Sequence, residues 1–196
     1  FMGALNDIAV YLLQTGLGFY LIIVMLRFIM QLVRADFYNP ISQFVFKATQ
    51  PIVGPLQTIL KPIGRFDPAS LTLAIALQIA GIVLLLMLNN VTTPNPVTLF
   101  LWGFVGALGL LVKIYFYALL ATIILSWISP GGSNPAAYLL HQITEPVMAP
   151  VRSLLPPMGG LDFSPIVVFI LINIIEITLR NIAQSIGLFP ALVIGL

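Results

Sequence analysis

The chain has 196 residues, of which 60% are hydrophobic and only 7% are charged. Because a soluble domain carries about 25% charged residues, the composition excludes a water-soluble enzyme. The chain contains no cysteine and one histidine, His141. That excludes disulfides, thiol nucleophiles, iron–sulfur clusters and metal sites made of several histidines from one chain. The net charge of +2 comes from scattered cations, which provide no basic surface for nucleic acid.

Four apolar stretches are long enough to cross a bilayer, which takes about 20 residues of helix. In chain order they are residues 8–33, 69–88, 99–128 and 165–186. No cation precedes the first stretch, so we expect it to remain in the mature protein rather than to be cleaved as a signal peptide. The prediction is an all-α membrane protein with four transmembrane helices.

The distribution of cations predicts the orientation of these spans. The two long polar segments, one within each pair of spans, contain Arg34, Lys47, Lys61, Arg65 and Arg152. The N-terminal flank and the central connection contain none. By the positive-inside rule, both long segments are expected in the cytoplasm and both termini outside.

The chain repeats itself without a gap, residue 39 onward matching residue 134 onward. In both copies, apolar residues follow an Asn-Pro pair at the spacing of one helix face. Such self-similarity predicts an internal duplication. The identical residues are Asn39, Pro40, Thr49, Pro51, Pro55, Pro62, Gly64 and Asp67, which recur as Asn134, Pro135, Thr144, Pro146, Pro150, Pro157, Gly159 and Asp162.

Each copy is interpreted as a span, a short amphipathic helix, a Pro-rich turn and a second span. We place the repeats at residues 1–97 and 98–196 of one compact membrane domain, with amphipathic helices at residues 40–50 and 135–145. Because each copy contains two spans, the copies insert with the same orientation. They are therefore parallel repeats, unlike the inverted repeats of many transporters.

The ends of the amphipathic helices follow from residue types. Asn39 and Asn134 are expected to be N-caps that accept a hydrogen bond from an otherwise unpaired amide, each with a proline at the first helical position. Pro51 and Pro146 are expected to end these helices, because proline lacks the amide N–H. The motif residues serve either as such caps and turns or as a surface for a partner or for lipid.

The same reasoning applies to the second span of each copy. Asp67 is expected to begin one of these spans, and either Asp162 or Ser164 is expected to cap the other. Gly64 and Gly159 are expected to adopt positive φ angles where the chain reverses toward the span.

The Asn-Pro, Thr-x-Pro-x3-Pro and Pro-x-Gly-x2-Asp motifs, placed twice between hydrophobic spans, resemble the YggT family, called YlmG in some bacteria and in plastids. The resemblance covers nearly the whole chain. It implies a small, multi-pass protein of the bacterial plasma membrane or of plastid membranes. The family is linked to osmotic stress and ion homeostasis, to cell division and nucleoid distribution, and in plastids to cytochrome b6 haem assembly. It supplies no catalytic residue.

Four ionisable residues lie within the predicted spans, where each costs about 2.5–3.5 kcal/mol at mid-helix. Lys113, Glu176 and Arg180 are predicted at similar depth. Glu176 is then either a counter-ion for Lys113 and Arg180, an arrangement that we call the structural clasp, or part of a polar cavity for an ion or proton. In the structural clasp, changing Glu176 to glutamine would destabilise the protein. Contacts to another subunit are a further alternative. Arg27, closer to the cytoplasmic boundary, is expected to snorkel or to bond Gln78.

Gly103, Gly106 and Gly109 place small residues at intervals of three in the third span. Small residues permit close approach of helices. Packing within one chain is the expected use, and a contact between two copies is the alternative.

These patterns favour a non-enzymatic membrane protein that acts as an accessory or scaffold factor in envelope, division or membrane-complex assembly. The chain shows no nucleophile with a base, no metal-ligand set and no phosphate loop, and we expect no cofactor. The expected partners are the lipid bilayer and a membrane or cytoplasmic protein, with a homo-oligomer as an alternative. The alternative function is an ion-conducting or ion-regulating protein in osmotic stress adaptation. A haem-assembly role would require axial ligation by His141 or methionine.

Overall fold

The computed structural model describes residues 2–128, 134–155 and 162–196. Over these residues the chain is helical, and four helices are long and apolar enough to cross a membrane. This confirms the predicted all-α fold with four spans. The spans are α1 (Met2–Val33), α3 (Pro68–Leu88), α4 (Pro96–Ile128) and α6 (Ser164–Ser185), and the other helices are α2 (Pro40–Ile59), α5 (Pro135–Leu154) and the short 3₁₀ helix η1 (Pro190–Leu192).

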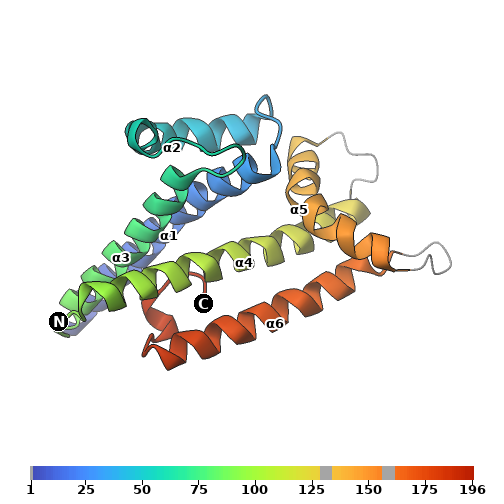
Figure 1. Cartoon of the computed structure of the whole chain (residues 1–196). Helices are drawn as coiled ribbons and strands as arrows, with labels where there is room; N and C mark the ends of the chain where they lie inside the picture. The colour runs from blue at the N-terminus through green and yellow to red at the C-terminus, as the bar shows by residue number, and fades with distance from the viewer. Residues whose placement is uncertain (1, 129–133, 156–161) are drawn as a thin grey trace.

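The two amphipathic helices lie at the same end of the bundle, as parallel repeats require. Figure 1 shows α2 and α5 beyond one end of the long helices, with the N-terminus at the opposite end. Helix α1 packs on α3, α3 on α4, and α4 on α6, so that the α3–α4 contact joins the two repeats. Near the starts of α2 and α5 the repeats are also joined by hydrogen bonds from Asn39 Nδ2 to the Pro135 carbonyl (2.7 Å) and from the Asp36 N–H to Gln142 Oε1 (2.9 Å).

Helices α2 and α5 are longer than predicted, since neither Pro51 nor Pro146 ends its helix. Helix α2 continues to Ile59 and α5 to Leu154, each with a second internal proline one turn later. All four prolines are exposed, so water can hydrate the carbonyls that they leave without an amide partner. Burial of Val53 in α2 and of Met148 in α5 continues the apolar face beyond the prolines.

The predicted N-caps of α2 and α5 are confirmed. Asn39 is extended (φ −61°, ψ 130°), and its side chain accepts a hydrogen bond from the Ile41 N–H at 2.9 Å. Asn134 accepts from the Ala136 N–H at the same distance. Each cap is followed by a proline whose missing N–H requires no partner at this position.

The predicted start of α3 is confirmed, whereas that of α6 is wrong. Asp67 is the N-cap residue of α3, but its side chain makes no capping hydrogen bond. The N-cap of α6 is Phe163, so neither Asp162 nor Ser164 is the cap, although Asp162 Oδ1 accepts the Ser164 N–H at 2.9 Å. Gly64 has φ +62°, which confirms the positive φ predicted there.

The C-terminal segment after α6 folds back into the bundle, which the sequence analysis did not predict. Figure 1 shows the chain turning from the end of α6 toward α4. Leu188 and Val193 are buried in a core shared with α3 and α4. The buried Gln78 of α3 forms two hydrogen bonds with Ile194, from Nε2 to the carbonyl (2.7 Å) and from the N–H to Oε1 (3.2 Å).

The glycines of α4 make room for this packing. A Cβ on Gly106 would lie 3.0 Å from Val193, and one on Gly109 would lie 3.0 Å from the Gly195 carbonyl. A Cβ on Gly103 would instead meet the Ile79 side chain of α3 at 2.5 Å. The glycine stripe therefore serves packing within one chain, as expected.

Candidate functional site

The most extensive buried polar network is centred on Arg27 of α1. Its side chain is almost fully buried and neither snorkels nor reaches Gln78. Its Nη1 donates to Thr49 Oγ1 and its Nη2 to Gln50 Oε1, each at 2.9 Å, and Nη2 also lies 3.4 Å from Gln57 Oε1. The guanidinium carbon lies 4.6 Å from the ring centre of Phe46. Helix α2 thus surrounds the cation with acceptors and an aromatic face.

Asp67 supplies the negative charge of this network. Its carboxylate is fully buried, and Oδ2 lies 3.9 Å from Nε of Arg27. The same oxygen accepts hydrogen bonds from Gln57 Nε2 at 3.1 Å and from the Ser70 hydroxyl. Two motif residues, Thr49 and Asp67, are therefore the partners of one buried cation. Sequence reasoning assigned Asp67 to a helix start and did not pair it with Arg27, although both lie at the same end of their spans.

In the second repeat, the aspartate that corresponds to Asp67 also pairs with an arginine, but this arginine comes from α5 and not from the first span of the repeat. Arg152 of α5 stands where Gln57 stands in the first repeat, and its Nε lies 3.1 Å from Asp162 Oδ2. Its Nη1 also lies 2.7 Å from Oε1 of Glu145, the counterpart of Gln50. The hydrogen bond to Glu145 raises the pKa of Arg152 above its already high value, so the side chain stays charged. This network is exposed, whereas that of the first repeat is buried.

The Asn-Pro pairs meet where α2 and α5 adjoin. A cavity of about 230 Å³ opens between the starts of the two helices. Besides the two Asn-Pro pairs it is lined by Asp36, Tyr38 and Tyr138. The caps of the two repeats thus lie together.

The other motif residues occupy separate places. Thr144 is buried and donates its hydroxyl to the Leu140 carbonyl at 2.9 Å within α5. Pro62 lies in the exposed turn between α2 and α3, and the internal prolines Pro55 and Pro150 face outward. Pro157 and Gly159 lie outside the described residues, so the positive φ predicted for Gly159 remains a prediction.

The two cap residues should differ in their contribution to stability. We expect Asn134→Ala to lower the free energy of unfolding by about 1 kcal/mol through loss of the cap. Asn39→Ala should cost about 2–3 kcal/mol, because Asn39 is buried and also donates across the repeat boundary to Pro135. Unfolding of both variants by steric trapping in bicelles measures the difference. Equal losses would show that the bond between the repeats does not stabilise the fold.

The charges of the spans do not form the predicted three-residue clasp. Arg180 Nη2 lies 3.9 Å from Glu176 Oε2 within α6, with side-chain exposures of 53% and 23%. Among the described residues, Lys113 forms no ion pair with Glu176, and its side chain is half-buried on α4. The counter-ion arrangement therefore links Glu176 to Arg180 alone. The sequence predicts depth along a helix but not the rotation of that helix about its axis.

The pair belongs to a polar flank of α6, in which Asn173 and Arg180 are exposed and Glu176 is partly buried. Asn173, Glu176 and Arg180 follow one another at i, i+3 and i+7 and so lie along one side of the helix. The neighbouring side chains of Ile170 and Ile177 are 53% and 60% exposed. We call Asn173, Glu176 and Arg180 the α6 polar flank.

His141 and the acidic residues near it provide a weak basis for metal binding. The exposed His141 lies 3.9 Å from Glu145 on the next turn of α5. Within the described parts of the chain, no group of three or more His, Asp or Glu side chains is placed to hold a metal ion.

Comparisons with known proteins agree with the duplication. A family model described as CCB3/YggT matches the chain twice, over residues 6–88 and 101–183. A Pseudomonas aeruginosa protein is 45% identical over 95% of this chain and 96% of its own length. The Escherichia coli protein YggT is 39% identical over 93% of this chain and 95% of its own length.

One relative corresponds in length to a single repeat. The ycf19 protein of Guillardia theta is 35% identical over 46% of this chain and 97% of its own length. No solved structure matches this chain. The double family match and the near full-length relatives show that the chain belongs to the CCB3/YggT family.

Proposed function

We propose that the chain is a non-enzymatic scaffold or accessory factor of the bacterial plasma membrane that binds another membrane protein through the α6 polar flank. Envelope assembly and cell division are the processes in which we expect it to act. The excess of cations around α2 and α5 supports a cytoplasmic position for these helices, with both termini outside.

The exposure of charge on a spanning helix carries this proposal. An ionised side chain near the middle of a span costs about 2.5–3.5 kcal/mol unless protein or water surrounds it. Glu176 lies midway along α6, and Arg180 one turn later is half exposed beside isoleucines. A polar surface on the partner would satisfy the hydrogen-bonding groups of both side chains.

Photocrosslinking from two sides of α6 tests the proposal in native membranes. A photoreactive side chain replaces either Ile177, beside the flank, or Leu171, on the opposite side of the same helix. Both positions are exposed. We expect a discrete protein adduct from position 177 and only lipid adducts from position 171. Lipid adducts alone from both positions would contradict the proposal, and an adduct of two copies of this chain would identify a homo-oligomer.

Glu176→Gln separates the partner role from the structural clasp. Because the Glu176–Arg180 pair is long and partly exposed, its loss should change the free energy of unfolding by less than about 1 kcal/mol. The adduct from position 177 should nevertheless become weaker, since the partner loses a charged contact. Unfolding in bicelles and adduct yield are measured on the same variant. A large loss of stability with an unchanged adduct would restore the clasp interpretation.

An ion-conducting or ion-regulating role in osmotic stress adaptation is the second candidate, supported by Lys113, Glu176 and Arg180 within the spans. Ion flux through the purified protein in liposomes tests it. Flux that Glu176→Gln alters would favour this role, and flux equal to that of empty liposomes would count against it.

A further inference from the structure

A second cavity, separate from the α6 polar flank, lies at the α2 end of the first repeat. It has a volume of about 290 Å³ and opens between the end of α1, the first turns of α2 and the loop before α3. The loop is held by a pair of hydrogen bonds between Ile63 and Phe66, and the Phe66 ring packs edge-on against Phe28 at 5.5 Å. The cavity therefore has a fixed wall on its loop side.

Three arginines line this cavity: Arg27, Arg34 and Arg65. Arg27 is held at its inner side by α2, and Asp67 offsets its charge. Arg34 and Arg65 are exposed, and among the described residues neither forms an ion pair. Two guanidinium groups without a counter-ion among the described residues thus line the cavity, and the planar fork of donors on each suits phosphate oxygens.

Ser42 is an independent indication that a ligand belongs here. It lies in the first turn of α2 and lines the cavity, and its side chain is 98% buried. Among the described atoms its Oγ has no hydrogen-bond partner. A buried hydroxyl without a partner carries an uncompensated desolvation cost. A ligand oxygen in the cavity would accept its proton and remove that cost.

The remaining walls are apolar. Met30 and the edge-on pair Phe37 and Phe46, whose ring centres lie 5.1 Å apart, contribute carbon surface. The site therefore combines charge at one side with hydrophobic contact at another. That combination suits a ligand with a phosphate group joined to a less polar part.

The site is a property of the first repeat only. At the positions 95 residues later, the arginines and Ser42 are replaced by residues that cannot supply the same groups. Arg27, Arg34, Ser42 and Arg65 correspond to Thr122, Ser129, Ala137 and Gly160. Because the duplicated caps and prolines do not include Arg34, Ser42 or Arg65, the fold of the repeat does not by itself require these three residues.

We infer that this cavity binds the phosphate group of an anionic ligand. Arg34 and Arg65 contact the phosphate oxygens, the Ser42 hydroxyl donates to one of them, and Arg27, paired with Asp67, forms the inner wall. The cavity lies at the end of spans α1 and α3, where we expect lipid headgroups because the apolar spans end there. An anionic phospholipid and a soluble phosphate ester present the same chemistry to it.

Native mass spectrometry of the detergent-solubilised chain tests binding of phosphatidylglycerol against phosphatidylcholine. Calorimetry with glycerol 3-phosphate and with inorganic phosphate tests the soluble source. We expect either phosphatidylglycerol or the soluble phosphates to bind. The class that binds identifies whether the natural ligand is a lipid or a soluble phosphate ester. Failure of both classes, or equal binding of phosphatidylglycerol and phosphatidylcholine without soluble phosphate binding, would overturn the inference.

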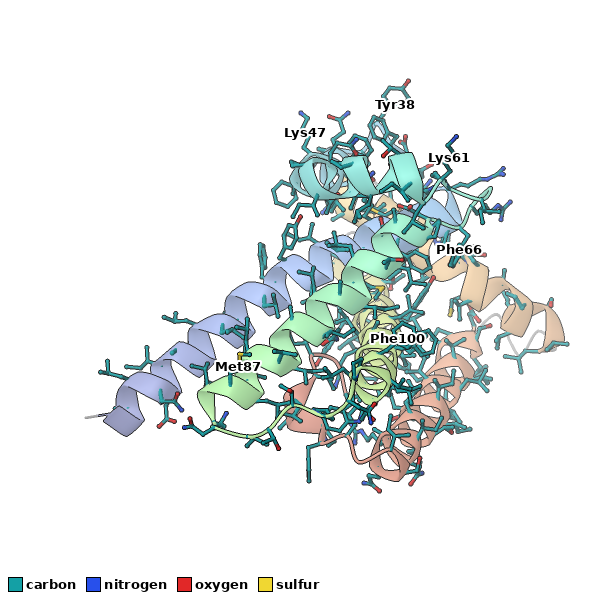
Figure 2. All side chains as sticks on the ribbon, turned by 60° about the vertical axis from the view of Figure 1, so that its left-hand side comes forward. Tyr38, Lys47, Lys61, Phe66, Met87 and Phe100 are labelled. Atoms are coloured by element: carbon teal, nitrogen blue, oxygen red, sulfur yellow. The ribbon has the colours of Figure 1, made fainter. Side chains whose placement is uncertain are left out.

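Charge-matched variants separate the cavity from the general surface charge. Arg34→Gln with Arg65→Gln should weaken anion binding about tenfold or more. Lys47→Gln with Lys61→Gln removes the same charge from side chains that Figure 2 shows at the same end of the molecule, outside the cavity lining. We expect less than about a threefold effect from it. An equal effect of both pairs would show surface attraction and overturn the cavity site.

Ser42→Ala provides a variant that should fold normally. It removes a buried polar group without a partner, so the ligand-free protein should be as stable as the wild type or more so. Anion affinity should fall severalfold, because the ligand loses one donor. Unchanged affinity would exclude Ser42 from the site. Because no variant touches α6, these results are independent of the proposed protein partner.

Discussion

Replacing Arg27 by methionine is expected to lower the free energy of unfolding by about 3–5 kcal/mol, the largest effect that we predict for a single substitution. The substitution keeps much of the side-chain volume but leaves Asp67 fully buried without its cation. Breaking a buried ion pair from one side costs this much because the remaining charge stays desolvated. Steric trapping in bicelles measures the loss.

The double variant Arg27→Met with Asp67→Asn identifies the cause. If the uncompensated carboxylate is responsible, the second change should restore about 2 kcal/mol. Arg152→Met in the second repeat is the matched control, because its pair with Asp162 is exposed. It should cost less than about 1 kcal/mol. Similar losses from Arg27 and Arg152 would show that burial does not distinguish the two networks.

Replacing Gln78 by alanine should cost about 2–4 kcal/mol and release the C-terminal segment. The change leaves the partly buried N–H and carbonyl of Ile194 without their side-chain partner, and an unpaired group costs about 1–3 kcal/mol when it is fully buried. Hydrogen exchange of residues 188–196 should rise along with the loss of stability.

Gln14→Ala is the control for this prediction. Gln14 of α1 also contacts the C-terminal segment, but its bond to the Ala191 carbonyl is exposed and 3.4 Å long. Its loss should therefore lie within about 0.5 kcal/mol. A large loss of stability from Gln78→Ala without increased exchange at residues 188–196 would mean that Gln78 acts elsewhere.

Local signals in the sequence predicted the architecture well. The starts of α2 and α5 depend on two adjacent residues, an asparagine and a proline, whose preferences need no tertiary context. The four spans follow from length and hydropathy, and the duplication from residue identity. These features could be predicted without knowing which faces of the helices pack against one another.

The errors arose where tertiary contacts override a local preference. Pro51 and Pro146 normally indicate helix ends, yet both helices continue because further apolar turns pack against the bundle. The sequence predicts Lys113 at the depth of Glu176, but among the described residues Lys113 forms no ion pair with that carboxylate.

The candidate site was predicted only in part. Thr49 and Asp67 were recognised from repetition, but repetition could not identify Arg27 as their partner because the second repeat has Thr122 at that position. Arg34 and Arg65 entered the sequence analysis only as indicators of orientation. Comparison of the two repeats for residues that differ, as well as for those that agree, would have pointed to both features.

The fold-back of the C-terminal segment has a consequence for biosynthesis. Gln78 and Ile194 are 116 residues apart. During translation, α3 is therefore synthesised and inserted long before Ile194, the hydrogen-bond partner of the Gln78 side-chain amide, has been made. Until Ile194 has been made, the Gln78 side chain must contact lipid, water or an insertion factor instead. Final closure of the bundle is therefore a post-insertion step, and a chaperone that shields this amide would act on the half-made chain.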